Sequence, residues 1–336
     1  MLLRRIKFLA IAAVLMLLFT SATGNNTTTI FIIGDSTAAN KDTTGGKQER
    51  GWGMVLQNYF NPDYIVIDNH AVNGRSSKSF IDEGRWDRVL KKMKPGDYVV
   101  IQFGHNDEKP KADRHTDPGS TFDYNLAKFV RETRELGGIP ILMNCVVRRN
   151  FFVQAPENDD DEKLRTTTFK DGVKMVEGDT LIDTHGLYAV APRDVARRMH
   201  VHFVDANRLT HELEQGLGRE DSKKLHMWFL PGEEPSVPKG RQDNTHYNVH
   251  GAQVVAHLLA DALCEEIPVL GRYRCNADIT VDTLGRGDFM SLDDALRSVD
   301  PLKPCTIQIL SGEWVKPQLP RKARIEFVLR EGAVWK

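Results

Sequence analysis

The chain has 336 residues, with 45 basic and 46 acidic side chains and a formal net charge of −1. This balance argues against nucleic acid or an anionic membrane surface as a partner. The length exceeds what one hydrophobic core usually needs, so two domains are expected.

The first residues have the features of a targeting segment. Basic residues up to Lys7 precede an apolar run from Phe8 to Phe19, and small residues follow up to Gly24. This pattern predicts a secretory signal peptide over residues 1–24 rather than a membrane span. Its removal leaves 42 basic and 46 acidic side chains. The mature protein is therefore expected to be secreted or periplasmic, with no membrane partner.

From residue 25 to residue 267, short apolar runs alternate with helical patterns. Near-continuous apolar runs are typical of a parallel sheet that is covered on both faces. The predicted strands are residues 29–33, 64–67, 98–103, 139–147 and 201–204, and the clearest helices are residues 86–93, 122–136 and 251–263. The fold class is therefore α/β, a flavodoxin-like three-layer α/β/α sandwich, with ligands expected at the carboxyl ends of the strands.

The alternation stops at residue 268, where a short β-rich segment, residues 268–336, begins. Its pattern predicts strands over 278–281, 306–310 and 324–329 and a helix over 292–299. A segment of this size is marginal as an independent domain, so we expect it to lean on the first one. An acidic run at residues 157–163 is interpreted as a solvated loop, because a calcium site needs more regular ligand spacing.

The four cysteines are too few and too scattered for a disulfide scaffold. Cys145 lies in an apolar stretch and is expected to be a buried free thiol. Cys275 and Cys305 can form a bridge in an oxidising compartment.

Four polar motifs occur in a fixed order along the chain. The first three follow the first three predicted strands, and the fourth lies in a predicted polar loop just ahead of the last helix of the sandwich. They are Gly34-Asp35-Ser36-Thr37, Asn73-Gly74-Arg75-Ser76, Gly104-His105-Asn106-Asp107 and Asp243-Asn244-Thr245-His246. Because the carboxyl ends of parallel strands meet at one edge, all four can form a single site.

The motifs supply the residue types of an acyl-transfer site. Ser36, expected at the first turn of a helix, is the candidate nucleophile, His246 the base and Asp243 the carboxylate that orients it. The backbone N–H groups of Ser36 and Gly74 and the side-chain amide of Asn106 are candidate oxyanion donors, helped by the helix N-terminus. Taken singly, each motif also fits a helix cap or an ordinary Asn-Gly turn.

These motifs, together with Gly51-Trp52-Gly53, Gly96-Asp97-Tyr98 and the run 102–107, resemble the SGNH (GDSL-type) hydrolases, and within them the rhamnogalacturonan acetylesterases. The resemblance extends over residues 29–263. It implies a triad of Ser36, Asp243 and His246, an oxyanion hole of Ser36, Gly74 and Asn106, and an acetylated pectic polysaccharide as substrate.

Other side chains near the motifs fit such a substrate. Arg75, Lys78 and Arg85 can bind uronate carboxylates, and Trp52 and Tyr247 can stack on sugar rings. Two of these residues have an alternative role: Arg85 can form an internal ion pair, and Trp52 can belong to the core.

Three further histidines have side chains that suit a base or a metal ligand. His250 is a rival base, but its position suits a helix start. His200 and His202 lie on one strand face without a further ligand nearby, so no metal or other cofactor is expected.

The C-terminal segment resembles a different family. Residues 279–281, 285–289, 292–296 and 307–312 look like the opening of a pectin methylesterase β-helix, whose catalytic carboxylates lie well beyond this opening. Residues 268–336 are therefore expected to carry no methylesterase activity.

The sequence thus predicts a secreted, metal-independent serine esterase that deacetylates a rhamnogalacturonan-type polysaccharide, with residues 25–267 as its catalytic domain. Two alternatives stay open. One is an acetyl esterase that acts on xylan or small acyl esters, and the other is a catalytically silent polysaccharide-binding module.

Overall fold

The computed structural model describes residues 27–151 and 178–336. The expected signal peptide and the acidic run at residues 157–163 lie outside the described residues. The elements ahead of the C-terminal segment are β1 (Thr28–Gly34), η1 (Thr44–Gly46), α2 (Trp52–Val55), η2 (Leu56–Tyr59), β2 (Ile65–Asn69), α3 (Ser77–Asp82), α4 (Arg85–Leu90), β3 (Tyr98–Gln102), α5 (Thr121–Glu135), β4 (Ile139–Met143), α7 (Leu187–Met199), β5 (His202–Val204), α8 (Ala206–Asp221), η3 (Ser222–Leu225), β6 (His226–Phe229), β7 (Arg241–Tyr247), α9 (Val249–Glu266) and α10 (Pro268–Gly271).

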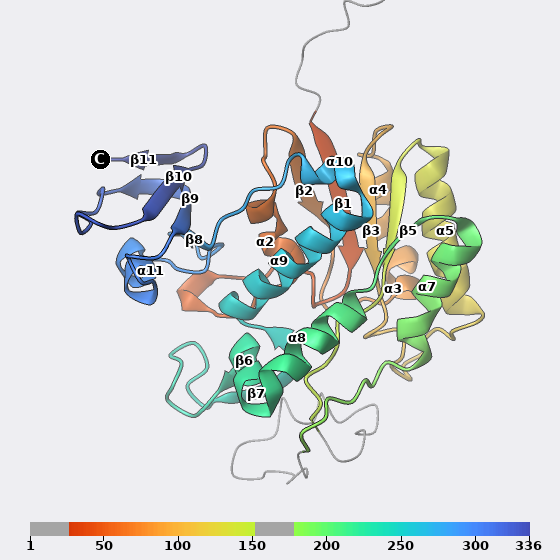
Figure 1. The fold of residues 1–336 in the computed structure, drawn as a ribbon. Helices are drawn as coiled ribbons and strands as arrows, with labels where there is room; N and C mark the ends of the chain where they lie inside the picture. Colours follow the sequence, from red (N-terminus) through yellow and green to blue (C-terminus); the bar gives the residue numbers. More distant parts are fainter. Residues whose placement is uncertain (1–26, 152–177) are drawn as a thin grey trace, which may run out of the picture.

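A five-stranded parallel sheet forms the centre of the molecule (Figure 1). Its strand order is β2-β1-β3-β4-β5, and every neighbouring pair in it is parallel. The central strand β3 is buried along its whole length, as its unbroken apolar run predicts. The five strands overlap the five predicted runs, and the predicted α/β class is confirmed.

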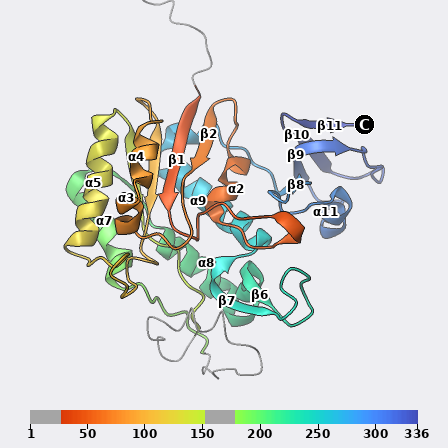
Figure 2. The ribbon, with the colours of Figure 1, turned by 180° about the vertical axis from the view of Figure 1, so that it is seen from behind.

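Helices cover both faces of this sheet, as Figures 1 and 2 show from opposite sides. Along β1, Ile30 and Ile32 join a hydrophobic core on the side of α2 and α9. Phe31 and Ile33, which point the other way, join a second core on the side of α3, α4, α5 and α7. Side chains alternate between the faces of a strand, so one apolar run supplies both cores.

The fourth motif lies in a strand, not in the predicted polar loop. β7 pairs with β6 in a two-stranded antiparallel sheet, and a register shift falls between His226 and Trp228. The backbone N–H of Arg50 also donates to the Tyr247 carbonyl, at 3.0 Å. The polar sequence of β7 lacks the apolar alternation by which strands are recognised, so local pattern could not predict this pairing.

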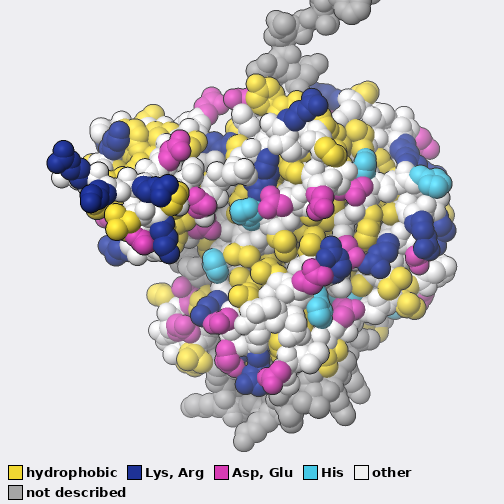
Figure 3. Space-filling model, viewed as in Figure 1, with side chains coloured by type: hydrophobic (Ala, Val, Ile, Leu, Met, Phe, Trp, Pro, Cys, Tyr) yellow, Lys and Arg dark blue, Asp and Glu magenta, His cyan; other side chains and the backbone are white. Residues whose placement is uncertain are grey.

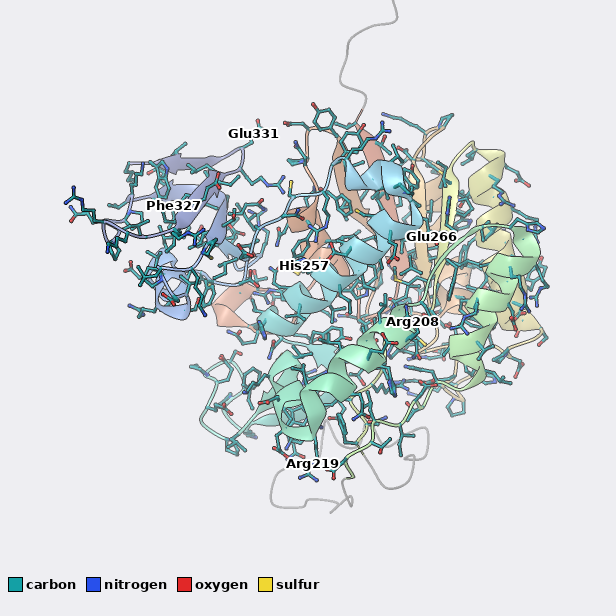
Figure 4. All side chains as sticks on the ribbon, viewed as in Figure 1. Arg208, Arg219, His257, Glu266, Phe327 and Glu331 are labelled. Carbon is teal, nitrogen blue, oxygen red and sulfur yellow. The ribbon has the colours of Figure 1, made fainter. Side chains whose placement is uncertain are left out.

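The C-terminal segment forms a small sheet of its own beside the sandwich (Figure 1). Its elements are β8 (Ile279–Asp282), α11 (Leu292–Ser298), β9 (Cys305–Trp314), β10 (Ile325–Leu329) and β11 (Ala333–Trp335). All strand pairings in this sheet are parallel. Figure 3 shows Lys and Arg side chains on its outer side, and Figure 4 places Phe327 on β10, where its ring packs against Trp335 with centroids 5.4 Å apart.

Polar contacts join the C-terminal segment to the sandwich. Gln308 and Arg330 both donate to the backbone carbonyl of Asn58, at 3.1 and 3.0 Å, and Nε of Arg50 donates to the Gly285 carbonyl at 2.8 Å. The segment therefore contacts the sandwich through specific hydrogen bonds and also has an apolar cluster of its own around Val281 and Ile307.

All four cysteines lie within the described residues, and all are free thiols. Cys145 is buried, as predicted. The bridge that Cys275 and Cys305 could form is absent from this structure, where both are free thiols. Among the described helices, none combines the length and the apolar character that a bilayer span requires.

Candidate active site

Ser36 lies in a tight turn directly after β1. The turn is closed by the backbone N–H of Ala39, which donates to the Asp35 carbonyl at 3.1 Å, and it is backed by the N–H of Trp52, which donates to the Thr37 carbonyl at 2.9 Å. Residues 36–38 form this single turn rather than the predicted helix. A helix dipole therefore does not assist the Ser36 N–H, and that part of the prediction is corrected.

The structure brings Ser36, His246 and Asp243 together from opposite ends of the sandwich sequence. Nε2 of His246 lies 2.8 Å from Oγ of Ser36. Nδ1 of His246 lies 3.0 Å from Oδ2 of Asp243, which is fully buried. Asp243 is held in place by the backbone N–H groups of Thr245 and His246, which donate to Oδ1 at 2.9 and 3.0 Å. This is the geometry in which an imidazole can take a proton from a hydroxyl.

A second buried carboxylate supports the Ser36 turn from behind. Oδ1 of Asp35 accepts hydrogen bonds from the backbone N–H and the hydroxyl of Thr37, at 2.9 and 2.8 Å. Burial alone would raise the pKa of Asp35, but His105 and the bonds from Thr37 lower it to about 2. Asp35 is therefore ionised at neutral pH and fixes the conformation of the turn.

Gly74 and Asn106, two of the three candidate oxyanion donors, lie in loops that are bonded to each other. Gly74 has a φ of 73°, a left-handed conformation that favours glycine. The side-chain amide of Asn106 donates to the Arg75 carbonyl at 3.3 Å, which leaves its second N–H for another acceptor. Asp107 accepts from the hydroxyls of Ser77 and Thr116, at 2.5 and 2.8 Å. These bonds hold Asn106 beside the loop that carries Gly74.

Replacing Asn106 by alanine is expected to lower kcat for ester hydrolysis by about 10²- to 10³-fold, because one donor to the developing oxyanion is lost. Steady-state rates with a small acetate ester measure the effect. Asn61→Ala is a matched control, because Asn61 lies before β2 at the opposite edge of the sheet. Wild-type kcat in folded Asn106→Ala would remove this residue from the oxyanion hole.

The aromatic residues that were expected to stack on sugar are part of the core. Trp52 and Tyr247 are both 0% exposed, and the indole N–H of Trp52 donates to Gln102 at 3.3 Å. The rings pack against apolar residues on the α2 and α9 side of the sheet, so neither can contact a polysaccharide. Their assignment as substrate-binding residues is therefore wrong.

The three basic residues near the second motif are partly exposed, and each faces an acid. Nε of Arg75 and Nε of Arg85 lie 3.1 and 2.5 Å from Oε2 of Glu83, and Lys78 pairs with Asp82 at 3.1 Å. A substrate carboxylate would have to compete with these acids. The internal pairing considered for Arg85 is thus present.

Sequence reasoning missed four charged residues close to the site. Arg241 donates to the carboxylate of Asp243, with Nη2 2.5 Å from Oδ2. Glu49 and Lys41 extend this contact towards Asn73. A methyl group placed on Gly74 would lie 3.9 Å from Nη1 of Arg114. Only Arg241 had a local signal, its position two residues before Asp243 on the same strand face.

One group of possible metal ligands lies behind the site. The side chains of His105, Cys145 and His185 are buried, with ligand atoms within 4.8 Å of one another. However, Nδ1 of His185 lies 2.9 Å from Glu108 and its Nε2 lies 3.1 Å from the Val146 carbonyl. Both ring nitrogens of His185 therefore have partners, whereas neither ring nitrogen of His105 makes a hydrogen bond within the described part of the chain and its Nδ1 lies 3.4 Å from Oδ2 of Asp35. With one imidazole already committed to hydrogen bonds, the group is not assigned as a metal site.

The other histidines singled out by the sequence lie elsewhere. His200 ends α7 with a φ of 52°, so it is not in a strand with His202, which pairs with Glu266 at 2.8 Å. His250 lies in the first turn of α9, as expected, and Asn248 caps that helix by accepting a hydrogen bond from the Gly251 N–H at 2.9 Å.

The chain is similar to several known proteins. It is 34% identical over 235 residues to rhamnogalacturonan acetylesterase RhgT of Bacillus subtilis, an alignment that covers 70% of this chain and 89% of that relative. It is 28% identical over 240 residues to a probable rhamnogalacturonan acetylesterase, YesY, of the same species, with 70% and 92% coverage. Among solved structures, YxiM of Bacillus subtilis matches with a TM-score of 0.54 and 24% identity, over 72% of this chain and 57% of that one.

Residues 32–254 match the GDSL-like Lipase/Acylhydrolase family. This range takes in strands β2 to β5, the end of β1 and all four motifs, and it confirms the resemblance found in the sequence. The resemblance of residues 268–336 to a pectin methylesterase stays a prediction. The chain therefore belongs to the GDSL-like lipase/acylhydrolase family and is a carboxylic ester hydrolase.

Proposed function

We propose that this protein deacetylates a rhamnogalacturonan-type pectic polysaccharide through an acetyl-enzyme on Ser36. The observation that carries the proposal is the pair of contacts that His246 makes, 2.8 Å to Oγ of Ser36 and 3.0 Å to Oδ2 of Asp243. The similarity to RhgT and YesY supports the substrate class.

In the first half-reaction, Nε2 of His246 takes the proton of Ser36 as Oγ attacks the acetyl carbonyl carbon. The oxyanion that forms accepts hydrogen bonds from the N–H groups of Ser36 and Gly74 and from the amide of Asn106. The intermediate then collapses with cleavage of the bond between the acetyl carbon and the sugar oxygen, and the imidazolium, stabilised by Asp243, donates its proton to that oxygen, so the sugar leaves as an alcohol. Water, activated by the same imidazole, releases acetate in the second half-reaction.

Acetate release from a panel of acetylated polymers tests this proposal. Acetylated rhamnogalacturonan is expected to be the best substrate, ahead of acetylated xylan and a small acetate ester. Faster release from xylan would replace the proposed substrate, and polymer binding without any acetate release would favour a silent binding module. Incubation of the protein with methylated pectin is expected to release no methanol.

The C-terminal segment belongs to this proposal as the opening of a β-helix that lacks methylesterase activity. Support comes from its strand pairings, which are all parallel, and from the cluster around Val281, Ile307 and Ile309 that they enclose. For the N-terminus, we propose export of the mature chain to the periplasm or the medium.

Arg114 is expected to contribute to the choice of an acidic polysaccharide. Its Nε and Nη2 face the exposed carboxylate of Asp113, at 3.2 and 3.3 Å, whereas Nη1 is the group near Gly74. A guanidinium at this position can bind a uronate carboxylate next to the acetylated residue.

Arg114→Gln is therefore expected to raise KM for acetylated galacturonate-containing oligosaccharides by about tenfold, the effect of losing one charge-assisted hydrogen bond. KM for an uncharged acetate ester should stay the same. Arg197→Gln is the control, because Arg197 lies in the last turn of α7, towards the opposite edge of the sheet. An equal rise in KM for both substrates would contradict a role in charge recognition.

A further inference from the structure

A chain of ionic contacts begins at Lys41, between the Ser36 turn and α2. Nζ of Lys41 lies 2.8 Å from Oε1 of Glu49 and 2.6 Å from Oδ1 of Asn73. The Lys41 side chain is only 5% exposed, and Asn73 directly precedes Gly74. Lys41 therefore connects Glu49 to the loop that carries a proposed oxyanion donor.

The second carboxylate oxygen of Glu49 continues the chain towards the proposed triad. Oε2 of Glu49 accepts from Nη1 of Arg241 at 2.8 Å. Arg241 uses its other two nitrogens on Oδ2 of Asp243, with Nη2 at 2.5 Å and Nε at 3.1 Å. The planar guanidinium thus holds the two carboxylates in a fixed relation.

We propose that Glu49 is a positioning residue that ties Asp243, through Arg241, and the loop of Gly74, through Lys41, into one rigid unit. This inference rests on the roles proposed above for Ser36, His246, Asp243 and Gly74. None of Glu49, Arg241 and Lys41 is assigned to the reacting atoms. They act through the residues that they hold.

The backbone keeps Glu49 beside β7. The next residue, Arg50, pairs with Tyr247 through its N–H, and the Arg50 guanidinium binds the carbonyls of Lys47 and Glu49, at 2.7 and 2.8 Å. The four charged side chains in this series of contacts are largely buried, and the two acids balance the two bases. They are Lys41, Glu49, Arg241 and Asp243. Removal of one member leaves the others with an uncompensated charge.

The series of ionic contacts from Lys41 to Asp243 also sets the electrostatic environment of His246. Burial would raise the pKa of Glu49, but His246, Lys41 and Arg241 lower it to about 2, so Glu49 is anionic throughout the working range. Asp243 must stabilise the imidazolium while it also binds Arg241, and Glu49 offsets the charge of Arg241. Charged groups close to His246 include Asp243 and Arg241 on β7, Glu49 and Lys41 ahead of α2, and Asp35 in the Ser36 turn. Arg114 lies further along the site, beside Gly74.

The pH dependence of kcat/KM for a small uncharged acetate ester tests the proposal in the full chain. Glu49→Gln removes a negative charge and disfavours the imidazolium, so the acidic limb of the profile is expected to move to lower pH by roughly half a unit. Lys41→Gln removes a positive charge, so the limb is expected to move to higher pH by a similar amount. Both variants should lower kcat about tenfold with little change in KM, because positioning is lost.

Matched variants separate this effect from general damage. Asp42→Asn and Lys47→Gln remove the same kinds of charge from the same segment, and these two side chains are each 54% exposed and pair with each other. They should leave the acidic limb in place. Glu49→Asp and Lys41→Arg keep the charges and should retain the wild-type limb, and they decide the question if a glutamine variant does not fold.

Opposite shifts for Glu49→Gln and Lys41→Gln support the proposal, because loosened packing alone would not move the two limbs in opposite directions. Unmoved limbs, or shifts in the same direction, overturn it. If Ser36→Ala keeps its activity, the proposed function itself fails. If Ser36→Ala is inactive while both glutamine variants match the wild type, only the positioning role of Glu49 is lost.

Discussion

Replacing Ser36 by alanine is expected to lower kcat for acetate release by about 10⁴- to 10⁶-fold, the loss found when a serine nucleophile is removed from a triad. The hydroxyl oxygen that His246 contacts at 2.8 Å disappears, so no acetyl-enzyme can form. Activity that remains would come from water attacking an ester held in the oxyanion hole. Initial rates with an acetylated polymer and with a small ester measure the loss.

Two controls make the Ser36 experiment decisive. A serine-reactive phosphonate should add to the wild-type protein and not to Ser36→Ala, as read by intact mass. Thermal unfolding should be similar in both proteins, because the substitution removes one hydroxyl from a half-buried side chain. Acetate release at the wild-type rate would exclude Ser36 as the nucleophile.

Asp243→Asn is expected to lower kcat by about 10⁴-fold, because an amide cannot hold His246 in the tautomer that accepts the serine proton. The carboxylate here also accepts two backbone N–H groups and binds Arg241, so its loss leaves Arg241 without that partner. Steady-state kinetics across neutral pH measure the effect.

Asp221→Asn provides the control for Asp243→Asn. Asp221 is exposed at the end of α8, where it pairs with Lys224 at 2.6 Å, and its replacement should leave kcat unchanged. If folded Asp243→Asn were as active as this control, another group would have to orient His246.

Local sequence patterns were sufficient for the sheet and for the order of the motifs. The apolar runs that contain Ile30 and Val100 became β1 and β3, because a strand buried on both faces has few alternatives to an unbroken apolar sequence. The turns after these strands then had to meet at one edge of a parallel sheet. This topological necessity explains why Ser36 and Asn106 were both placed in the site from sequence.

Burial of particular side chains was less predictable. Trp52 and Tyr247 flank motif residues, which made them plausible sugar contacts, but both are enclosed by the core. Position next to a motif in sequence does not fix the direction in which a side chain points. In β7, for example, successive side chains point to opposite sides of the strand.

The sequence by itself determined the fold class, the family and the identity of the candidate nucleophile, base and carboxylate, because these depend on local periodicity and on short motifs. Only the tertiary structure decided which charges surround them. Lys41 contacts Glu49, and Glu49 contacts Arg241, about 190 positions further along the chain, each at 2.8 Å, and no local pattern records these contacts. Such long-range pairing follows from the packing of the loop ahead of α2 against β7. It links the residues around Asp243 to the loop that carries Gly74.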